Sequence, residues 1–393
     1  MKAIRLGLLP RIIIAIALGI GLGLVVPDGV TRLFLTFNAI FSQFLGFAIP
    51  LIILALVAEA IGSIGHSAGK MLLLTVAIAY GSTVFSGYLA YFTGDAIFPH
   101  LIEPGKVEQL QSAGEALTPY FTVEMPPVMG VMTALVLAFI LGLGIAHLES
   151  KALKHVIVDL KDIISSVIEK VIIPLLPLYI FGIFLEMACS GKVAGVLVVF
   201  IKIIGVIFAL HILLLLLQFS IAGVITKKNP LRLLGNMLPA YFTALGTASS
   251  AATIPVTLAQ AKKNGTSDGV ASFVVPLCAT IHLSGSTLKI VSCALALILM
   301  QGGTYDLGLF THFILLLGVT MVAAPGVPGG AIMAALAILQ SILGFTVEEQ
   351  ALMISLYITM DSFGTACNVT GDGAIALVVD KLLGYKVQGS ATA

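Results

Sequence analysis

Long apolar segments separated by short polar connections run through the whole sequence. Most of them reach the roughly 18–20 residues that a helix needs to cross the hydrocarbon core of a bilayer. Strands of a transmembrane barrel would instead alternate apolar and polar residues over about ten positions, so the pattern excludes a barrel. The first six segments are regular and predict transmembrane helices at about 9–26, 33–62, 69–97, 127–147, 164–189 and 193–225.

Two apolar segments of the second half are interrupted by small residues and proline. The first, 230–262, contains Ser-Ser-Ala-Ala-Thr-Ile-Pro, and the second, 308–345, contains Ala-Pro-Gly-Val-Pro-Gly-Gly. Backbone that leaves the helical path at membrane depth must be satisfied by protein or by a cavity, and paired broken segments indicate a binding site. We therefore expect two re-entrant helical hairpins, each followed by a span that polar residues break, at 269–300 and 351–380.

Charges in the connections set the expected orientation. Lysine and arginine gather near the N-terminus, around 151–161 and on both sides of the first hairpin, whereas the 98–126 and 345–350 connections carry mostly acidic residues. Because lysine and arginine collect in cytoplasmic loops, we expect the first hairpin to enter from the cytoplasm and the second from outside, with both chain termini cytoplasmic. Either interruption alone would fit a kinked helix. Two hairpins whose flanking connections lie on opposite sides of the membrane predict an inverted repeat.

Composition indicates a multi-pass membrane protein. The chain is 59% hydrophobic and 10% charged, with a mean hydropathy of +1.12, whereas a soluble domain has roughly 25% charged residues. Its four cysteines lie inside apolar segments without metal-ligand spacing, so no disulfide framework is predicted. The basic residues before the first apolar run would also suit a signal peptide, but no clear cleavage pattern follows and we expect a retained helix.

A stripe of polar residues crosses the last apolar segment. At roughly 100° per residue, Asp361, Thr365, Asn368 and Asp372 share an arc of roughly 60° on one helix face. A charge near the bilayer centre costs at least ~2.5–3.5 kcal/mol, so such residues face a bundle interior, a water-filled cavity or a bound ion. The stripe therefore predicts a transport site.

The preceding broken span holds a second polar group, His282, Ser284, Ser286 and Lys289. The two serines would also suit packing positions at which their hydroxyls bond backbone carbonyls. Lys289 follows His282 by seven residues, on one face of a continuous helix, and lies about mid-span, where a lysine cannot easily extend to water. Other polar residues of the apolar segments lie near segment ends or alone and are interpreted as interfacial or structural: Glu186, Lys202 and His211.

Three motifs stand in order in the second half: Ser-Ser-Ala-Ala-Thr-Ile-Pro-Val-Thr at 249–257, Gly-Val-Pro-Gly-Gly-Ala-Ile-Met at 326–333, and Asn-Val-Thr-Gly-Asp at 368–372. With the order of six spans, hairpin, broken span, hairpin and final span, they resemble the dicarboxylate/amino acid:cation symporter family, which has the glutamate-transporter fold. The resemblance covers nearly the whole chain. It implies an all-α membrane protein of eight transmembrane helices plus two opposed re-entrant helical hairpins, arranged as inverted repeats.

The family resemblance also implies a domain organisation. Residues 1–229 would form mainly the scaffold and trimerisation spans, with about 69–97 and 193–225 packing on the core. Residues 230–393 would form the transport core, which slides through the scaffold of a homotrimer in an elevator-type movement. This core would comprise hairpin 1 (230–262), a broken span (269–300), hairpin 2 (308–345) and a broken final span (351–380).

Individual residues receive roles from the same resemblance. Asp361 would accept the α-amino group of an amino acid, Asn368 would bind the α-carboxylate, and Thr365 would lie between them. Asp372 would supply a carboxylate to a sodium ion. The implied substrate site comprises Ser249, Ser250, Gly326, Val327, Asp361, Gly364, Thr365 and Asn368, and the implied sodium site comprises Asn368, Asp372, Ser284 and Ser286.

Three departures from the family pattern matter. Gly364 stands where members that carry acidic amino acids have an arginine, so the sequence predicts a divergent member that prefers neutral amino acids. The family's Asn-Met-Asp-Gly-Thr reads His282-Leu-Ser-Gly-Ser286, which replaces an amide and a carboxylate used for sodium. Lys289 is not part of the pattern. We expect it to pair with Asp372 in place of a bound cation, and we regard His282 and Lys289 as candidates for coupling.

The predicted function is cation-coupled symport of neutral amino acids across the cytoplasmic membrane. Because histidine changes charge readily near neutral pH, a proton-coupled or uncoupled carrier of another small amino- or carboxylate-bearing solute is the alternative. A channel would also place polar residues mid-membrane. The sequence has no nucleophile elbow and no zinc-ligand spacing, so we do not expect an enzyme. The expected partners are a small amino acid, the bilayer and two further copies of the chain, with no nucleic acid and no cofactor beyond a sodium ion.

Overall fold

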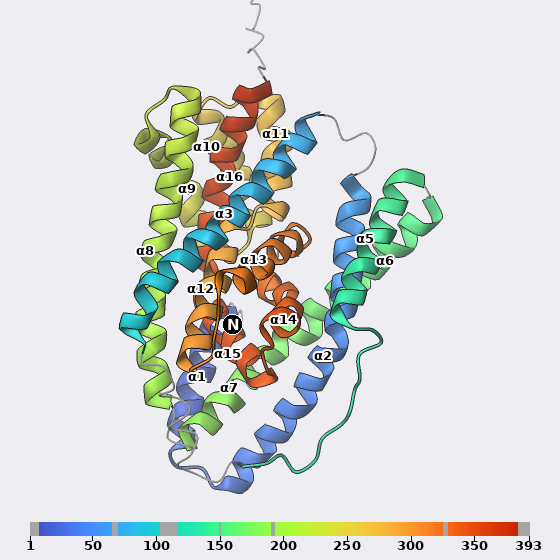
Figure 1. Ribbon diagram of the computed structural model, residues 1–393, viewed down its shortest axis with the longest axis vertical. Helices are drawn as coiled ribbons and strands as arrows, with labels where there is room; N and C mark the ends of the chain where they lie inside the picture. Colours follow the sequence, from blue (N-terminus) through green and yellow to red (C-terminus); the bar gives the residue numbers. More distant parts are fainter. Residues whose placement is uncertain are drawn as a thin grey trace, which may run out of the picture.

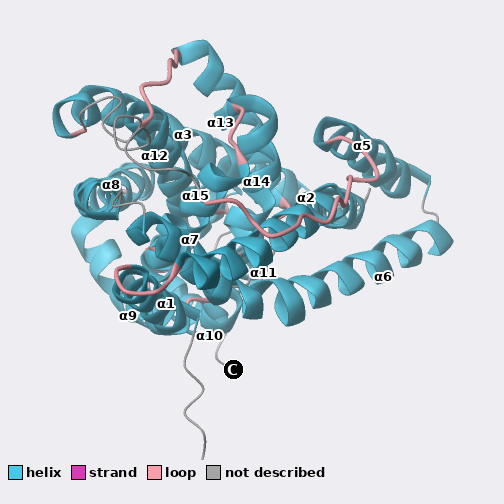
Figure 2. Ribbon diagram, turned by 90° about the horizontal axis from the view of Figure 1, so that it is seen from below, coloured by secondary structure: helices cyan, strands magenta, loops and turns pink. Residues whose placement is uncertain are grey.

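The computed structural model describes residues 8–64, 70–102, 117–148, 151–189, 193–324 and 329–383. These residues form helices and short connections, and none of those described lies in a strand (Figure 2). The helices are α1 (Leu8–Gly23), α2 (Asp28–Ile64), α3 (Lys70–Leu101), α5 (Val131–Leu148), α6 (Lys151–Val167), η1 (Ile168–Ile172), α7 (Ile173–Cys189), α8 (Val193–Thr226), α9 (Pro230–Thr247), α10 (Ser250–Lys263), α11 (Asp268–Ile281), α12 (Ser284–Met300), α13 (Leu307–Val322), α14 (Gly330–Leu343), α15 (Val347–Thr359) and α16 (Asp361–Leu383).

Several of these helices are long and apolar enough to cross a membrane. Their outer faces carry exposed apolar side chains, among them Leu73, Ile201 and Val224, which fits contact with lipid. The prediction of an all-helical, multi-pass membrane protein is confirmed. By length and composition, the spanning helices among the described residues are Asp28–Glu59, Lys70–Leu101, Lys151–Cys189, Leu197–Thr226 and Asp268–Met300, with shorter apolar helices beside them.

The helices pack in two groups (Figure 1). In one group α2 lies against α5, α6 and α7, and α7 lies against α1. In the other, α3 and α8 pack on α12 and α16, together with α9, α10 and α11. Every residue of α12 from Ser284 to Met300 is buried, so this helix has protein on all sides. α13, α14 and α15 contact helices of both groups, and the division into scaffold and transport core stays a prediction.

Each interrupted segment is divided into two helices. α9 and α10 lie side by side and are joined by Ala248, whose left-handed φ of 49° turns the chain, and by Ser249, which caps α10. α13 and α14 also pack on each other. α14 begins after Gly329, whose φ of +76° is a conformation that glycine adopts without strain. Residues 325–328, which contain Gly326 and Val327, lie outside the described residues.

Two further breaks separate α11 from α12 and α15 from α16. α11 ends before His282, which has an extended conformation, and α12 starts at Ser284. α15 ends before Met360, and α16 starts at Asp361. Both breaks therefore bring a polar residue of the predicted site to a helix terminus, where backbone N–H groups lack intrahelical partners.

One span is longer than predicted. The segment expected at 164–189 begins at Lys151, because α6, η1 and α7 form a continuous run to Cys189. The sequence does not show the N-terminal part of this span as an apolar segment because α6 is amphipathic. Ile157 and Ile164 are buried, whereas the lysines of α6 are exposed or half-exposed.

Candidate functional site

The polar stripe of α16 is buried in the second group of helices. Asp361, Thr365, Asn368 and Asp372 are all 7% exposed or less. They face the break between α11 and α12, whose polar residues His282, Ser284, Ser286 and Lys289 are also buried. The structure thus brings the two polar groups of the sequence together in one site.

Asn368 ties α16 to the N-terminus of α12. Its Oδ1 accepts hydrogen bonds from the backbone N–H of Gly285 at 2.7 Å and of Ser286 at 3.3 Å, and its Nδ2 donates to Ser286 Oγ at 3.1 Å. These N–H groups lie in the first turn of α12 and have no intrahelical acceptor. A Cβ on Gly285 would come within 2.7 Å of Cys367 Cβ and 2.8 Å of the Gly364 carbonyl oxygen, so only glycine permits this approach.

Lys289 pairs with Asp361 at the start of α16. Its Nζ lies 3.5 Å from Asp361 Oδ1 and donates to the Met360 carbonyl at 3.2 Å. The same ammonium group lies 3.7 Å from the centre of the Tyr357 ring, within range of a cation–π interaction. Asp361 Oδ2 accepts the backbone N–H of Gly329 at 2.8 Å. The carboxylate therefore joins the start of α14, the start of α16 and a fully buried lysine.

The side chain of Lys289 packs directly against the backbone of Gly364. A Cβ at position 364 would stand 2.5 Å from Lys289 Nζ and would also collide with Cε. Residue 364 is not arginine, and α12 places the ammonium group of Lys289 beside this position instead.

His282 pairs with Asp372 at the other end of the site. Its Nδ1 lies 2.9 Å from Asp372 Oδ1, and both side chains are buried. The ring Nε2 lies 3.1 Å from Ser82 Oγ of α3. Gln218 Nε2 of α8 donates to Ser82 Oγ at 3.0 Å and to Ser284 Oγ at 3.2 Å.

The expected pairing of Lys289 with Asp372 is therefore wrong, and the helix directions explain why. His282 meets Asp372, Gly285 meets Asn368, and Lys289 meets Asp361, so residue numbers rise along α12 as they fall along α16. In this antiparallel register Lys289, in the second turn of α12, reaches only the first turn of α16.

The four implied sodium ligands do not form an open set of oxygens. Asp372 Oδ1 faces His282, and Asn368 Oδ1 accepts two backbone N–H groups. Ser284 Oγ accepts from Gln218, and Ser286 Oγ accepts from both Tyr357 Oη and Asn368 Nδ2. A cation needs lone pairs that point at it. Since each of the four residues already has one oxygen in contact with a protein partner, they do not present four free oxygens to one sodium ion in the conformation described.

Residues at the tip of the first hairpin form hydrogen bonds with one another. Ser249 Oγ accepts the Ala252 N–H, and its carbonyl accepts hydrogen bonds from Thr247 and Thr253. Ser250 is buried at the start of α10. Within the described residues, no hydrogen bond joins either serine to α16, although α10 packs on α16.

Four residues of the site were not assigned to it from the sequence: Ser82, His211, Gln218 and Tyr357. His211, interpreted as interfacial or structural, is buried on α8 with its Nε2 3.1 Å from the Gly285 carbonyl oxygen. His211 and Gln218 are seven residues apart and so share a face of α8, a spacing that marks them as a polar stripe in an otherwise apolar helix. Lys202, in contrast, is exposed and donates to the Leu101 carbonyl, as expected of an interfacial lysine.

Long apolar helices around a buried site of paired charges define a multi-pass membrane transport protein. Comparison with known proteins gives the family. The chain belongs to the sodium:dicarboxylate symporter family, whose sequence model matches residues 8–382. The predicted resemblance is therefore confirmed.

Named relatives of this chain are amino acid transporters. It is 28% identical over 393 residues to the serine/threonine transporter SstT of Acinetobacter baumannii, covering 96% of this chain and 97% of the relative. It is 29% identical over 267 residues to an excitatory amino acid transporter of Caenorhabditis elegans, covering 66% of this chain and 52% of the relative. With human excitatory amino acid transporter 2 it shares 30% identity over 257 residues, 62% of this chain and 43% of the relative.

Proposed function

We propose that this protein is a secondary active transporter that carries a neutral amino acid across the cytoplasmic membrane in symport with a cation. The names of its relatives and of its family support amino acid transport and a coupling ion. The observation that carries the substrate class is the buried pair of Lys289 and Asp361, whose formal charges cancel.

A buried ammonium and carboxylate 3.5 Å apart suit a zwitterion. An amino acid that enters between them would place its α-ammonium on Asp361 and its α-carboxylate toward Lys289 and the amide of Asn368. Each charge then keeps an opposite partner, and the site with its substrate stays neutral. A second carboxylate would add an uncompensated charge in a low dielectric, which costs several kcal/mol. We infer that neutral amino acids are preferred for this reason, although the site does hold a cation.

The remaining residues of the implied substrate site would act around this pair. Thr365, one turn after Asp361 on the same buried face, would offer a hydroxyl to the substrate. Gly364 would leave room for Lys289. Ser249 and Ser250 of the first hairpin, and Gly326 and Val327 of the second, would approach the substrate when the hairpins close over it.

Coupling is proposed to depend on His282 and Asp372. In the family pattern a sodium ion offsets the carboxylate at the position of Asp372, and here a histidine nitrogen lies 2.9 Å from it. Because this contact provides a partner without an external ion, we expect a weak or shallow dependence on sodium. The alternative, a proton-coupled or uncoupled carrier, draws its support from the same histidine.

The proposed assembly is a homotrimer in which residues 230–393 move against a scaffold of mainly residues 1–229. Eight transmembrane helices and two hairpins that enter from opposite sides, with both termini cytoplasmic, complete this proposal. The burial of α12 on all sides and the pairing of α9 with α10 and α13 with α14 support it. The protein would move its solute without transforming it.

Uptake into proteoliposomes tests the proposal. We expect saturable uptake of radiolabelled serine, threonine or alanine, competed by neutral L-amino acids and only weakly by aspartate at the same concentration. The double variant Asp361→Asn, Lys289→Met, which keeps the site neutral but removes both charges, provides the matched control and should show no uptake. Aspartate competing as well as serine would contradict the substrate class, and uptake of no amino acid would contradict the function.

A further inference from the structure

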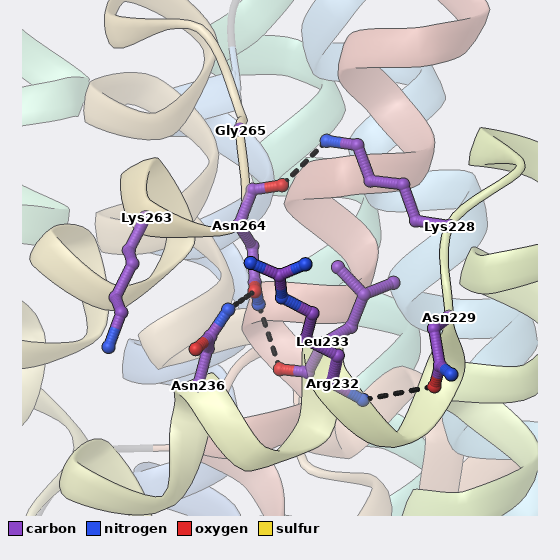
Figure 3. Close-up of a pocket in the computed structure, with 8 residues that line it drawn as sticks. All are labelled: Lys228, Asn229, Arg232, Leu233, Asn236, Lys263, Asn264 and Gly265. Carbon is purple, nitrogen blue, oxygen red and sulfur yellow. Dashed lines mark hydrogen bonds between the residues drawn. The ribbon is translucent and has the colours of Figure 1, made fainter.

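A pocket of about 400 Å³ lies between the two ends of the first helical hairpin (Figure 3). It is lined by the start of α9, the end of α10 and the turns beside them. We call it the basal pocket. Its lining includes three cationic side chains, Lys228, Arg232 and Lys263, and no acidic residue.

The charges of the basal pocket are not offset by neighbours. Within the part of the chain that the structure describes, none of its three cations makes an ion pair. The nearby Lys262 does, with Asp268 at 3.1 Å. Lys228 Nζ donates to the Asn264 carbonyl at 2.6 Å, and Lys228 and Lys263 stand on opposite sides of Arg232 (Figure 3). Three uncompensated cations around one hollow favour an anion.

Hydrogen bonds and a helix cap hold several of the polar residues that line the pocket. Asn264 is 4% exposed, donates to the Leu233 carbonyl at 3.0 Å and accepts from Asn236 Nδ2 at 2.8 Å. Asn229 caps the start of α9 and accepts the N–H groups of Leu231 and Arg232. Gly265, with a φ of +91°, leaves space that a Cβ would take from Lys228 Nζ. The positive end of the α9 dipole lies at the same place and favours the same anion.

The surroundings indicate where the anion comes from. The helices that precede and begin at the pocket carry exposed apolar side chains: Ile221 and Val224 on α8, and Leu231, Leu238 and Phe242 on α9. Leu231, Leu238 and Phe242 are spaced by seven and four residues and so share one face of α9. Basic residues beyond the end of an apolar helix face are typical of the membrane–water interface, where phospholipid headgroups lie.

We propose that the basal pocket binds a phosphate group, and that its physiological source is an anionic phospholipid whose acyl chain lies along the apolar face of α9. Arg232 would bind two phosphate oxygens through its planar guanidinium, and Lys228 and Lys263 would add charge on either side. Lysine and arginine excess is a feature of cytoplasmic connections, so the lipid belongs to the cytoplasmic leaflet.

Two measurements on the purified full-length protein test this inference. The first is thermal unfolding in detergent with phosphatidylglycerol, with phosphatidylcholine, or with inorganic phosphate, at constant sodium and constant ionic strength. The second is native mass spectrometry, which counts retained phosphatidylglycerol. The variants are Arg232→Gln, Lys263→Gln and the pair together. Lys151→Gln, which removes an exposed lysine outside the pocket, is the control.

We expect phosphatidylglycerol to raise the unfolding temperature and phosphatidylcholine to have little effect. Each variant should weaken the apparent affinity about fivefold, and the pair about 25-fold, from the attraction of about one surface charge each. Lys151→Gln should bind as the wild type does. Stabilisation by inorganic phosphate alone would keep the phosphate site but assign it to a soluble anion. Equal binding by the double variant and the control, or no binding of either phosphate source, would overturn the proposal.

Discussion

The ammonium group of Lys289 occupies the space above Gly364, and a Cβ on residue 364 would lie 2.5 Å from Lys289 Nζ. A side chain at position 364 and the lysine of α12 thus exclude each other. The cation that acidic-substrate members of the family place on α16 is here supplied by the neighbouring helix, where it is already paired with Asp361.

This exclusion predicts the effect of restoring the arginine. Gly364→Arg alone should reduce serine uptake by about tenfold or more, because two buried cations would then share one carboxylate. Gly364→Arg combined with Lys289→Met should recover uptake and extend it to aspartate, since the arginine gains both the space and the charge. Uptake of both amino acids into proteoliposomes is the measurement. A single Gly364→Arg variant that transports aspartate would show that Lys289 does not occupy this place.

A second prediction separates binding from stability at Asp361. Asp361→Asn leaves Lys289 buried without its carboxylate, which should cost about 3–5 kcal/mol of folding free energy and abolish serine binding. Adding Lys289→Met removes the orphaned charge, so thermal stability should return while binding does not. Asp268→Asn, at an exposed carboxylate, is the control for loss of one negative charge. Serine binding by the stable double variant, measured by calorimetry, would disprove the role of Asp361.

Local features of the fold could be predicted from the sequence because each depends on the residue types of one segment. Apolar length predicted the spans, and proline and glycine predicted the interruptions before α14 and within the first hairpin. The positive φ angles of Gly329 and Ala248 lie at those interruptions. The polar stripe of α16 was visible because helical periodicity alone places Asp361, Asn368 and Asp372 on one face, and all three are buried together.

The pairing of charges between helices could not be predicted in the same way. Periodicity assigns a residue to a face of its own helix, but not to a height on another helix. Their seven-residue spacing would place His282 and Lys289 on one face of a continuous helix, and both Asp361 and Asp372 were available as partners. The antiparallel register of α12 and α16, fixed by Asn368 on the N-terminus of α12, decides which cation meets which carboxylate.

A third prediction tests that register through Gly285. The Cβ of Gly285→Ala would meet Cys367 Cβ and the Gly364 carbonyl, neither of which is the flexible end of a side chain. We expect a loss of about 1–3 kcal/mol in stability, with weaker substrate binding as Asn368 is displaced. Gly269→Ala, whose Cβ has nothing within 4 Å, should be neutral or stabilise by about 0.4–1 kcal/mol. Unfolding curves that do not differ between the two variants would contradict the close contact of α12 with α16.

The last prediction concerns the ion requirement set by His282 and Asp372. His282→Leu leaves a buried carboxylate without its partner, so uptake should be lost or should come to require sodium. His282→Asn combined with Ser284→Asp restores the amide and the carboxylate of the family pattern and should steepen the dependence of uptake on sodium. Sodium is varied against choline at constant ionic strength.

Two variants make this comparison specific. Ser82→Ala removes the contacts of Ser82 Oγ with His282 Nε2 and Gln218 Nε2 but leaves the pair of His282 with Asp372, so the shallow sodium dependence should persist. Lys289→Met should change the affinity for serine without changing the response to sodium, because its partner is Asp361. Steep sodium-driven uptake by the wild type, unchanged in the His282→Asn, Ser284→Asp variant, would mean that histidine does not stand in for an ion. If Lys289→Met altered the sodium response and the changes at His282 did not, the coupling role would belong to the pair of Lys289 and Asp361.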